Sequence, residues 1–256
     1  MNMELKAVKV NVGYNEKKSV LRDLSFTLNN GLTGLIGTNG SGKSTLLKSL
    51  AGLTPLLDGE LYFNQQKLPI ESVNDLSKLI SVVLTEKVDV PYMTVNELVS
   101  SGRSPYTNIN GKMTNNDSVI IDEYMELCEL VHLRNKYVSE ISDGERQRIM
   151  IARALTQDTP IVLLDEPTSF LDFRSRYEIM ELLKKISASS NKLILFSSHD
   201  LELVFQLTDF CMVITEDKTL TKHTTDDLLQ SGIPEQLLSG TNLYFDISKR
   251  KIFYNS

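Results

Sequence analysis

The sequence predicts an α/β fold with a β-rich N-terminal part, a largely parallel core sheet and an inserted helical subdomain. Two observations predict it. Short apolar runs typical of strands alternate with helical segments near both ends of the chain, and the stretch between them has helical periodicity. At 256 residues, the chain has the length of one large domain, 1–256, that carries such an insertion.

The N-terminal part contains three expected strands. Val8, Val10 and Val12 alternate with polar residues, which is typical of a half-buried strand, and residues 24–28 repeat the pattern. The run over residues 32–36 loses the alternation, as a strand buried on both faces would. The opening of the chain is therefore expected to be rich in β structure.

A glycine-rich loop follows the third strand and leads into a helix expected over residues 44–50. Residues 37–44 fit the pattern G-x-x-x-x-G-K-[ST]. Glycines in such a loop let successive backbone N–H groups point inward and bind phosphate, the lysine reaches the β- and γ-phosphates, and the hydroxyl ligates Mg²⁺. The expected binding residues are Gly37, Thr38, Asn39, Gly40, Ser41, Gly42, Lys43, Ser44 and Thr45.

The middle of the chain, roughly residues 86–158, is expected to form the mainly helical insertion. Thr94 and Glu97 have the spacing of a capping box ahead of an apolar run. Ser142 and Glu145 form a second capping box, which opens a helix that reaches about residue 154. The apolar residues that recur at helical spacing between these two boxes are Ile121, Tyr124, Met125, Cys128 and Val131.

The strand–helix alternation then returns. Expected strands cover residues 161–164, 193–196 and 210–214, and a helix covers 175–186. The tail is expected to hold a short helix near Leu228 and a hairpin on which Leu243, Phe245 and Ile247 face one way, with the basic run 249–251 as its turn.

Two carboxylates, Asp165 and Glu166, follow the strand over residues 161–164. Ligands of α/β sheets bind at the carboxyl ends of the strands, so these side chains are expected beside the glycine-rich loop. Asp165 is expected to hold Mg²⁺, and Glu166 to polarise an attacking water. The pair is weak evidence by itself and becomes strong together with the loop.

The net charge, the positions of cysteine and histidine, and the hydropathy argue against several classes of protein. The net charge of −6 argues against broad nucleic-acid binding, so no nucleic-acid partner is expected. Cys128 and Cys211 lie in apolar runs, which indicates buried thiols in a reducing compartment, and the three histidines lack the spacing of metal ligands. The sequence contains neither a signal core nor an apolar stretch long enough to cross a bilayer, so a cytoplasmic location is expected.

With these motifs in order, the chain resembles the ATP-binding subunits of ABC transporters over nearly its whole length. Residues 141–145, Ile-Ser-Asp-Gly-Glu, stand where that family has its signature, usually Leu-Ser-Gly-Gly-Gln. Residues 169–172 look like its D-loop, which ends at Asp172, and His199 looks like its switch histidine. Tyr14 looks like the aromatic residue that stacks on adenine.

The resemblance implies an ATPase that works as a homodimer. In the family, the signature of one subunit closes over the nucleotide held by the other, which here assigns Ser142, Asp143, Gly144 and Glu145 to the partner's site. Ser142 and Glu145 could equally be only a helix cap, and the two roles are compatible. The catalytic residues implied are Glu166 and His199, with ATP and Mg²⁺ as ligands.

The sequence departs from the family at two places. Asp143 and Glu145 add negative charge near an anionic ligand, in positions that are usually neutral. Thr85 and Glu86 stand where the family has a glutamine that senses Mg²⁺, so either of them could contact the metal.

The segment 94–106 resembles the importers of iron-siderophore, haem and cobalamin, which implies permease subunits as partners, a substrate-binding protein acting indirectly, and a position on the inner face of the membrane. A capped surface helix would also explain this segment. Two other functions remain open: a soluble ABC ATPase of the cluster-assembly type, and a regulator that binds nucleotide without turnover.

Overall fold

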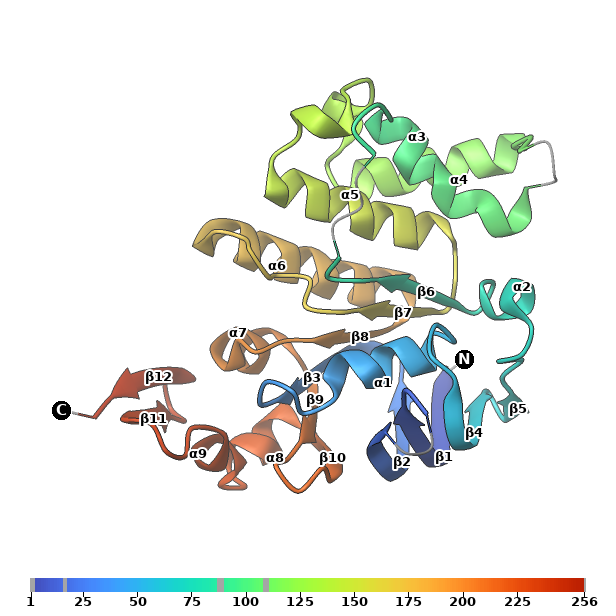
Figure 1. The fold of residues 1–256 in the computed structure, drawn as a ribbon. Coiled ribbons are helices and arrows are strands. Elements are labelled where there is room, and N and C mark those ends of the chain that lie inside the picture. Colours follow the sequence, from blue (N-terminus) through green and yellow to red (C-terminus); the bar gives the residue numbers. More distant parts are fainter. Residues whose placement is uncertain (1–2, 16–17, 87–89, 108–110, 256) are drawn as a thin grey trace.

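The computed structural model describes residues 3–15, 18–86, 90–107 and 111–255 (Figure 1). Their strands form a four-stranded sheet in the order β2-β1-β4-β5, a six-stranded sheet in the order β10-β9-β3-β8-β7-β6, and the two-stranded pair β11-β12. The predicted α/β fold is therefore confirmed, including its β-rich beginning.

The four-stranded sheet is antiparallel. Its strands are β1 (Glu4–Gly13), β2 (Ser19–Asn29), β4 (Leu56–Phe63) and β5 (Gln66–Lys67). The expected alternation of Val8 with Val10 and Val12 is wrong in one respect, because Val8 is only half-buried while Ala7 is buried. A bulge at Lys9, whose φ is 49°, shifts the phase of the strand at this point.

The six-stranded sheet is parallel except at one edge. It contains β3 (Gly31–Gly37), β6 (Ile80–Val83), β7 (Ile161–Leu164), β8 (Leu193–Ser197), β9 (Phe210–Ile214) and β10 (Leu220–Thr224), and β10 pairs antiparallel with β9. Residues 32–36 of β3 are all buried, as the loss of alternation in this run predicts. The loops after β3, β7 and β8 consequently meet at the same end of the sheet.

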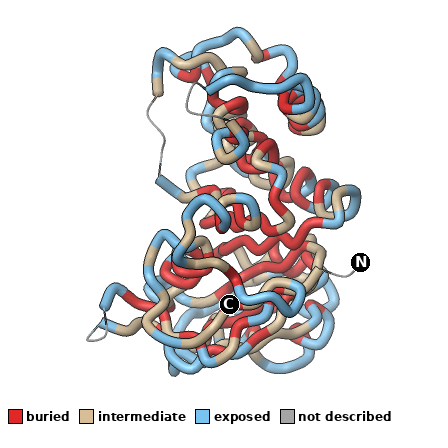
Figure 2. The backbone as a smooth tube through the Cα atoms, turned by 90° about the vertical axis from the view of Figure 1, so that its right-hand side faces the viewer, coloured by how far each residue is buried: buried red, intermediate tan, exposed pale blue. Residues whose placement is uncertain are grey.

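The two faces of this sheet contribute to different cores. Leu35, Leu163 and Leu195 pack against the four-stranded sheet and α1 (Lys43–Leu50), which lies between the sheets. The opposite face packs against α6 (Phe173–Ser190) and α7 (Leu201–Leu207). Figure 2 shows the buried residues concentrated in these layers and in the centre of the helical part.

The described residues between β6 and β7 form α3 (Val95–Ser100), η2 (Ser101–Tyr106), α4 (Asn115–Leu127), η3 (Val131–Leu133), η4 (Val138–Glu140) and α5 (Asp143–Thr156). Both expected capping boxes are present, at Thr94 and at Ser142. Val131 does not continue the apolar face of α4, because it belongs to η3 and is 54% exposed. Residues 87–89 and 108–110 of the expected subdomain lie outside the described part, and its limits, 86–158, stay a prediction.

The segment 94–106, which resembles the importers of iron-siderophore, haem and cobalamin, is held in this helical layer by contacts of Arg103 and Gly102. The buried Arg103 pairs with the Asp117 carboxylate at 2.8 Å and also donates to the carbonyl of Thr156 at 2.8 Å. Its guanidinium lies 4.1 Å from the centre of the Tyr106 ring. A Cβ on Gly102 would come within 2.1 Å of the Arg153 carbonyl oxygen, so η2 can approach α5 this closely only with glycine there.

The C-terminal part contains α8 (Thr225–Leu229), α9 (Ile233–Leu237) and the hairpin of β11 (Leu243–Asp246) and β12 (Lys251–Tyr254). Phe245 is buried against Phe205, but Ile247 does not share its face, since it lies in the turn and is 44% exposed. A remaining short helix, α2 (Val73–Leu76), precedes β6. None of the described helices has both the length and the apolar character needed to cross a membrane.

Candidate nucleotide-binding and catalytic site

The glycine-rich loop connects β3 to α1 at the carboxyl end of the parallel sheet (Figure 1). Gly40 and Gly42 have φ values of 74° and 113°, in the region that favours glycine. A Cβ on Gly42 would also lie 2.9 Å from Val20, so this position excludes larger residues on two grounds. The loop therefore has the backbone conformation expected of an anion nest.

Lys43 is folded back onto the loop. Its ammonium donates to the carbonyl oxygens of Gly37 at 2.8 Å and Thr38 at 3.2 Å. Burial lowers the pKa of this lysine, while the nearby carboxylates of Glu166 and Asp165 oppose that shift. The ammonium thus sits beside the nest, bonded to neutral oxygens that a phosphate oxygen could replace.

Asp165 connects the loop to the end of the sheet. Its buried carboxylate accepts through Oδ1 from the hydroxyl of Ser44 at 2.9 Å and from the hydroxyl of Ser197 at 2.7 Å. A hydroxyl and a carboxylate side by side offer the hard oxygen ligands that Mg²⁺ prefers. Among the described residues, no group of three or more His, Cys, Asp or Glu side chains lies close enough together to hold a metal ion.

Glu166 is held in place by three groups. Its backbone N–H donates to Ser197 Oγ at 2.9 Å, and its φ of 48° is unusual for a glutamate. Its carboxylate accepts from the Ser169 hydroxyl at 2.6 Å and lies 3.3 Å from Nδ1 of His199. The strand ends of β7 and β8 thus place Glu166 and His199 together, as their positions in the sequence predict.

Glu166 and the glycine-rich loop border a hollow of about 330 Å³. It is lined by residues 39–45 of the loop, by Glu166 and by Tyr14, and Val20 contributes an apolar wall. Tyr14 is 67% exposed, which leaves a ring face available for stacking. One hollow therefore contains an aromatic ring, an anion nest and a carboxylate, the three features needed to hold a nucleotide and activate water.

The two candidates for the missing metal sensor point in different directions. Thr85 donates its hydroxyl to the backbone carbonyl of Asp165 at 3.0 Å. The carboxylate of Glu86 pairs with Lys48 of α1 at 3.2 Å and is largely exposed. Thr85 is thus bonded directly to the residue expected to hold the metal, whereas Glu86 faces a surface cation.

The residues of the expected signature begin α5. The Ser142 hydroxyl bonds to the Glu145 carboxylate at 2.6 Å and accepts from the Glu145 backbone N–H at 3.3 Å. The hydrogen bonds that the Glu145 carboxylate accepts, first from the Ser142 hydroxyl and then from the Ser142 backbone N–H, lower the pKa of Glu145. The Glu145 carboxylate therefore covers the serine hydroxyl rather than projecting freely into solvent.

The start of α5 is packed against the start of α6. A Cβ on Gly144 would lie 2.9 Å from the Ser175 hydroxyl. That same hydroxyl donates to Asp172, whose side chain also accepts from the Ser175 backbone N–H and caps α6. Gly144 of the expected signature thus packs against the same serine that bonds to Asp172 of the expected D-loop.

The signature does not lie in the hollow that contains the loop. Asp143 lines a separate depression with Thr85, Glu86 and Phe170. In Figure 1, α5 belongs to the helical layer on the far side of β6 and β7, whereas α1 lies between the sheets. Within one chain, the glycine-rich loop and Asp143 of the expected signature therefore border different depressions.

Sequence reasoning missed Ser197, which bonds to Asp165, the bond from Ser169 of the expected D-loop to Glu166, and Lys218, which donates to the carbonyl oxygens of Gly40 and Ser41. The place of Ser197 at the end of a strand beside His199 was a signal that could have indicated it. Nothing in the local sequence indicates Lys218, because its partners are 178 and 177 residues away.

Comparison with known proteins agrees with this geometry. Residues 21–169 match the family described as ABC transporter. An uncharacterized ABC transporter ATP-binding protein of Methanocaldococcus jannaschii is 36% identical, over 97% of this chain and 88% of its own. A petrobactin import ATP-binding protein of Bacillus subtilis is 31% identical over 88% of both chains. A solved structure of a metal-chelate type ABC transporter, in an inward-facing conformation, shares the fold with a TM-score of 0.78 at 24% identity, over 98% of this chain and 95% of that chain.

Proposed function

The chain belongs to the ABC transporter family as one of its ATP-binding, ATP-hydrolysing subunits, and from that premise we propose that it powers an importer of iron-siderophore complexes. The cargo class is supported by the petrobactin import relative and by the resemblance of residues 94–106 to metal-chelate importers. Haem and cobalamin are the other cargoes that this resemblance allows.

The observation that carries the ATPase function is the convergence of the loop, Asp165, Glu166 and His199 at one end of the sheet. In this proposal Lys43 and the loop N–H groups bind the phosphates, and Tyr14 stacks on the adenine. Ser44 and Asp165 hold Mg²⁺, which offsets phosphate charge. Thr85, through the Asp165 carbonyl, is the favoured sensor of the metal.

In this proposal Glu166 orients and polarises the attacking water. His199 lies beside it and would stabilise the charge that develops on the γ-phosphoryl group, because catalysis of phosphoryl transfer depends mainly on positioning and electrostatics. Ser169 restricts the Glu166 carboxylate to the rotamer that faces the hollow.

A homodimer would complete the site. We propose that Ser142 and Gly144 of one subunit face the γ-phosphate held by the other, since within one chain the signature lies outside the hollow. The N-terminus of α5 suits that role because its helix dipole favours an anion. The close packing of Gly144 against Ser175, whose hydroxyl donates to Asp172, would couple closure to the neighbouring D-loop.

The rest of the assembly follows from the importer proposal. Two such subunits would dock on integral membrane permease subunits at the cytoplasmic face of the membrane, and a substrate-binding protein would deliver the cargo on the other side. A soluble cluster-assembly ATPase and a regulator without turnover are not favoured, because the named relative is an import protein and Glu166 and His199 are both in place.

The ATPase assignment is tested with Glu166→Gln. We expect the variant to bind Mg·ATP but to lose at least about 100-fold in turnover, and to accumulate as an ATP-bound dimer in size-exclusion chromatography. Glu235→Gln, on an exposed glutamate of α9, is the matched control and should remain at the parent rate. Turnover of Glu166→Gln within a factor of about two of the parent would refute the role of Glu166.

The transport assignment is tested in the native host. A strain that lacks the gene is compared with its parent for uptake of ferric siderophores, haem and cobalamin, and we expect the deletion to abolish uptake of a ferric siderophore. In a second experiment, a tagged subunit should copurify with a multi-span membrane protein. Copurification only with soluble factors, and unchanged uptake of every cargo, would move the assignment to the cluster-assembly ATPase.

A further inference from the structure

The hairpin between β9 and β10 reaches the nucleotide loop through one side chain. The Lys218 ammonium donates to the carbonyl oxygen of Gly40 at 3.0 Å and to that of Ser41 at 3.3 Å. Both carbonyls belong to the glycine-rich loop, so a cation from the far end of the chain is bonded to the backbone that is expected to bind phosphate.

These bonds fix two successive peptide planes. In a trans peptide the C=O and the following N–H point in opposite directions. Holding the Ser41 carbonyl toward Lys218 therefore directs the Gly42 N–H to the opposite side. The bond from Lys218 to the Gly40 carbonyl likewise directs the Ser41 N–H away from Lys218. This N–H donates to the Thr38 carbonyl oxygen at 3.1 Å and closes the turn.

Two lysines bond to different carbonyl oxygens of the glycine-rich loop. Lys43 bonds to those of Gly37 and Thr38, and Lys218 bonds to those of Gly40 and Ser41. In the proposed function Lys43 must leave its carbonyls for the phosphates. Lys218 contacts the loop from the carbonyl side, so its bonds can persist when a nucleotide is bound.

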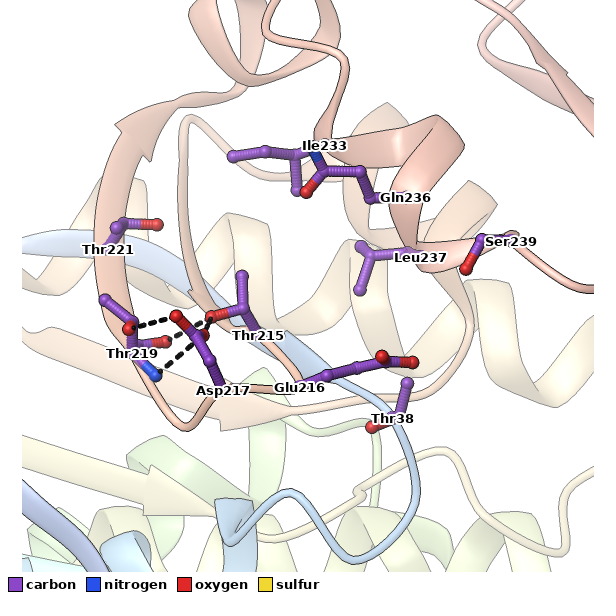
Figure 3. A pocket seen from close by; sticks show the side chains of 10 residues that line it. All are labelled: Thr38, Thr215, Glu216, Asp217, Thr219, Thr221, Ile233, Gln236, Leu237 and Ser239. Carbon is purple, nitrogen blue, oxygen red and sulfur yellow. Dashed lines mark hydrogen bonds between the residues drawn. The ribbon is translucent and has the colours of Figure 1, made fainter.

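The turn that carries Lys218 is itself braced. Asp217 accepts from the hydroxyls of Thr215 and Thr219 and from the Thr219 backbone N–H, and the Lys218 N–H donates to the Thr215 carbonyl at 3.0 Å. Figure 3 shows this group of side chains beside a pocket of about 520 Å³, with Thr38 of the loop across from it. The brace fixes the backbone from which the Lys218 side chain reaches the loop.

The backbone of this turn would favour glycine over lysine at position 218. Lys218 has a φ of 68°, a conformation in which glycine carries no Cβ penalty and lysine does. A lysine at this position therefore costs backbone free energy, and its two hydrogen bonds to the loop contribute in the opposite direction.

We infer that Lys218 is a positioning residue of the nucleotide site, which preorganises the loop by holding the Gly40 and Ser41 carbonyls away from the phosphates. The inference rests on the proposed nucleotide-binding function. It predicts that loss of the ammonium weakens nucleotide binding because the free loop then samples orientations that do not bind.

The test compares Lys218→Met, Lys218→Gly and Lys218→Arg in equilibrium titrations with Mg·ADP, a ligand that is not turned over. Methionine and glycine should each raise Kd by about fivefold to tenfold, since two hydrogen bonds from a charged donor are lost, while arginine should keep Kd within about twofold. Lys222→Met is the matched control, because Lys222 of the same hairpin donates to Thr27 rather than to the loop.

Thermal unfolding separates this role from a structural one. Lys218→Gly should melt no lower than the parent, because glycine suits the turn, yet it should still bind nucleotide weakly. In steady-state hydrolysis the KM for ATP should rise by a similar factor, with a smaller change in kcat.

Equal Kd values for the parent, Lys218→Met and Lys218→Gly would overturn the inference, and so would an equal loss in Lys222→Met. A parent that fails to bind Mg·ADP would instead overturn the proposed function, so the two failures are distinguishable.

Discussion

The hydroxyl of Ser197 gives the sharpest test of how the catalytic carboxylates are held. Ser197 is fully buried at the end of β8, donates to Asp165 Oδ1 at 2.7 Å and accepts from the Glu166 N–H at 2.9 Å. It therefore links the carboxylate expected to hold Mg²⁺ to the backbone of the residue expected to activate water. Ser197→Ala removes this link and adds no volume.

Two lost interactions set the expected decrease in the free energy of unfolding of Ser197→Ala. A hydrogen bond to a charged group contributes about 1.5–3 kcal/mol, and an unsatisfied buried N–H costs about 1–3 kcal/mol. Because Asp165 retains its bond from Ser44, we expect a net loss of about 2 kcal/mol in the free energy of unfolding. The strained φ of Glu166 would relax once the N–H is released, and the displaced carboxylate should lower kcat by about 10- to 100-fold.

The assay is phosphate release at saturating Mg·ATP, with urea unfolding measured in parallel. Ser198→Ala is the control, since Ser198 is also buried but accepts from Asp200 instead of bonding to either carboxylate. It should lose stability without a comparable fall in kcat. A kcat for Ser197→Ala that equals that of Ser198→Ala would refute the argument that this hydroxyl positions Glu166.

Arg103→Leu should lower the free energy of unfolding by about 3–5 kcal/mol in urea titrations, because it leaves the Asp117 carboxylate buried without its ion pair; a loss below about 1 kcal/mol would contradict this. Hydrogen bonds from Thr114, with a smaller contribution from Arg103, lower the pKa of Asp117, so its stabilisation is present above the unfolded pKa of about 3.9 and is lost as the pH falls through the folded value. Asp117→Asn should therefore flatten the acid limb of stability against pH, and an unchanged limb would count against it. Tyr14→Ala should raise the Kd for ATP by about tenfold and Tyr14→Phe should not, because stacking on a base contributes about 1–3 kcal/mol; equal Kd values for all three proteins would exclude stacking. Glu145→Gln keeps a side chain able to close the capping box but removes a negative charge, so it should strengthen ATP-dependent dimerisation several-fold in analytical ultracentrifugation, and a weaker dimer would contradict the proposed approach of this charge to phosphate.

The sequence alone predicted the parts of the molecule that depend on neighbours in the chain. The anion nest requires glycines and a lysine at fixed spacing, and the helix caps require residues three apart, so both can be recognised without a fold. Asp165 and Glu166 were located because a buried strand ends directly before them. The expected strands of the parallel sheet were found for the same reason, since an unbroken apolar run marks burial on both faces.

The tertiary structure decided which groups meet across long separations. The bulge at Lys9, the pairing of Glu86 with Lys48 and the burial of Arg103 against Asp117 each depend on packing between elements. Ser197 and Lys218 acquire their roles only when β8 and the β9–β10 hairpin are brought beside the loop. A hydroxyl or an ammonium has the same local signature wherever it occurs, and its partner is fixed by the fold, which is why the sequence determined the chemistry of the site and the folded chain determined what holds that chemistry in place.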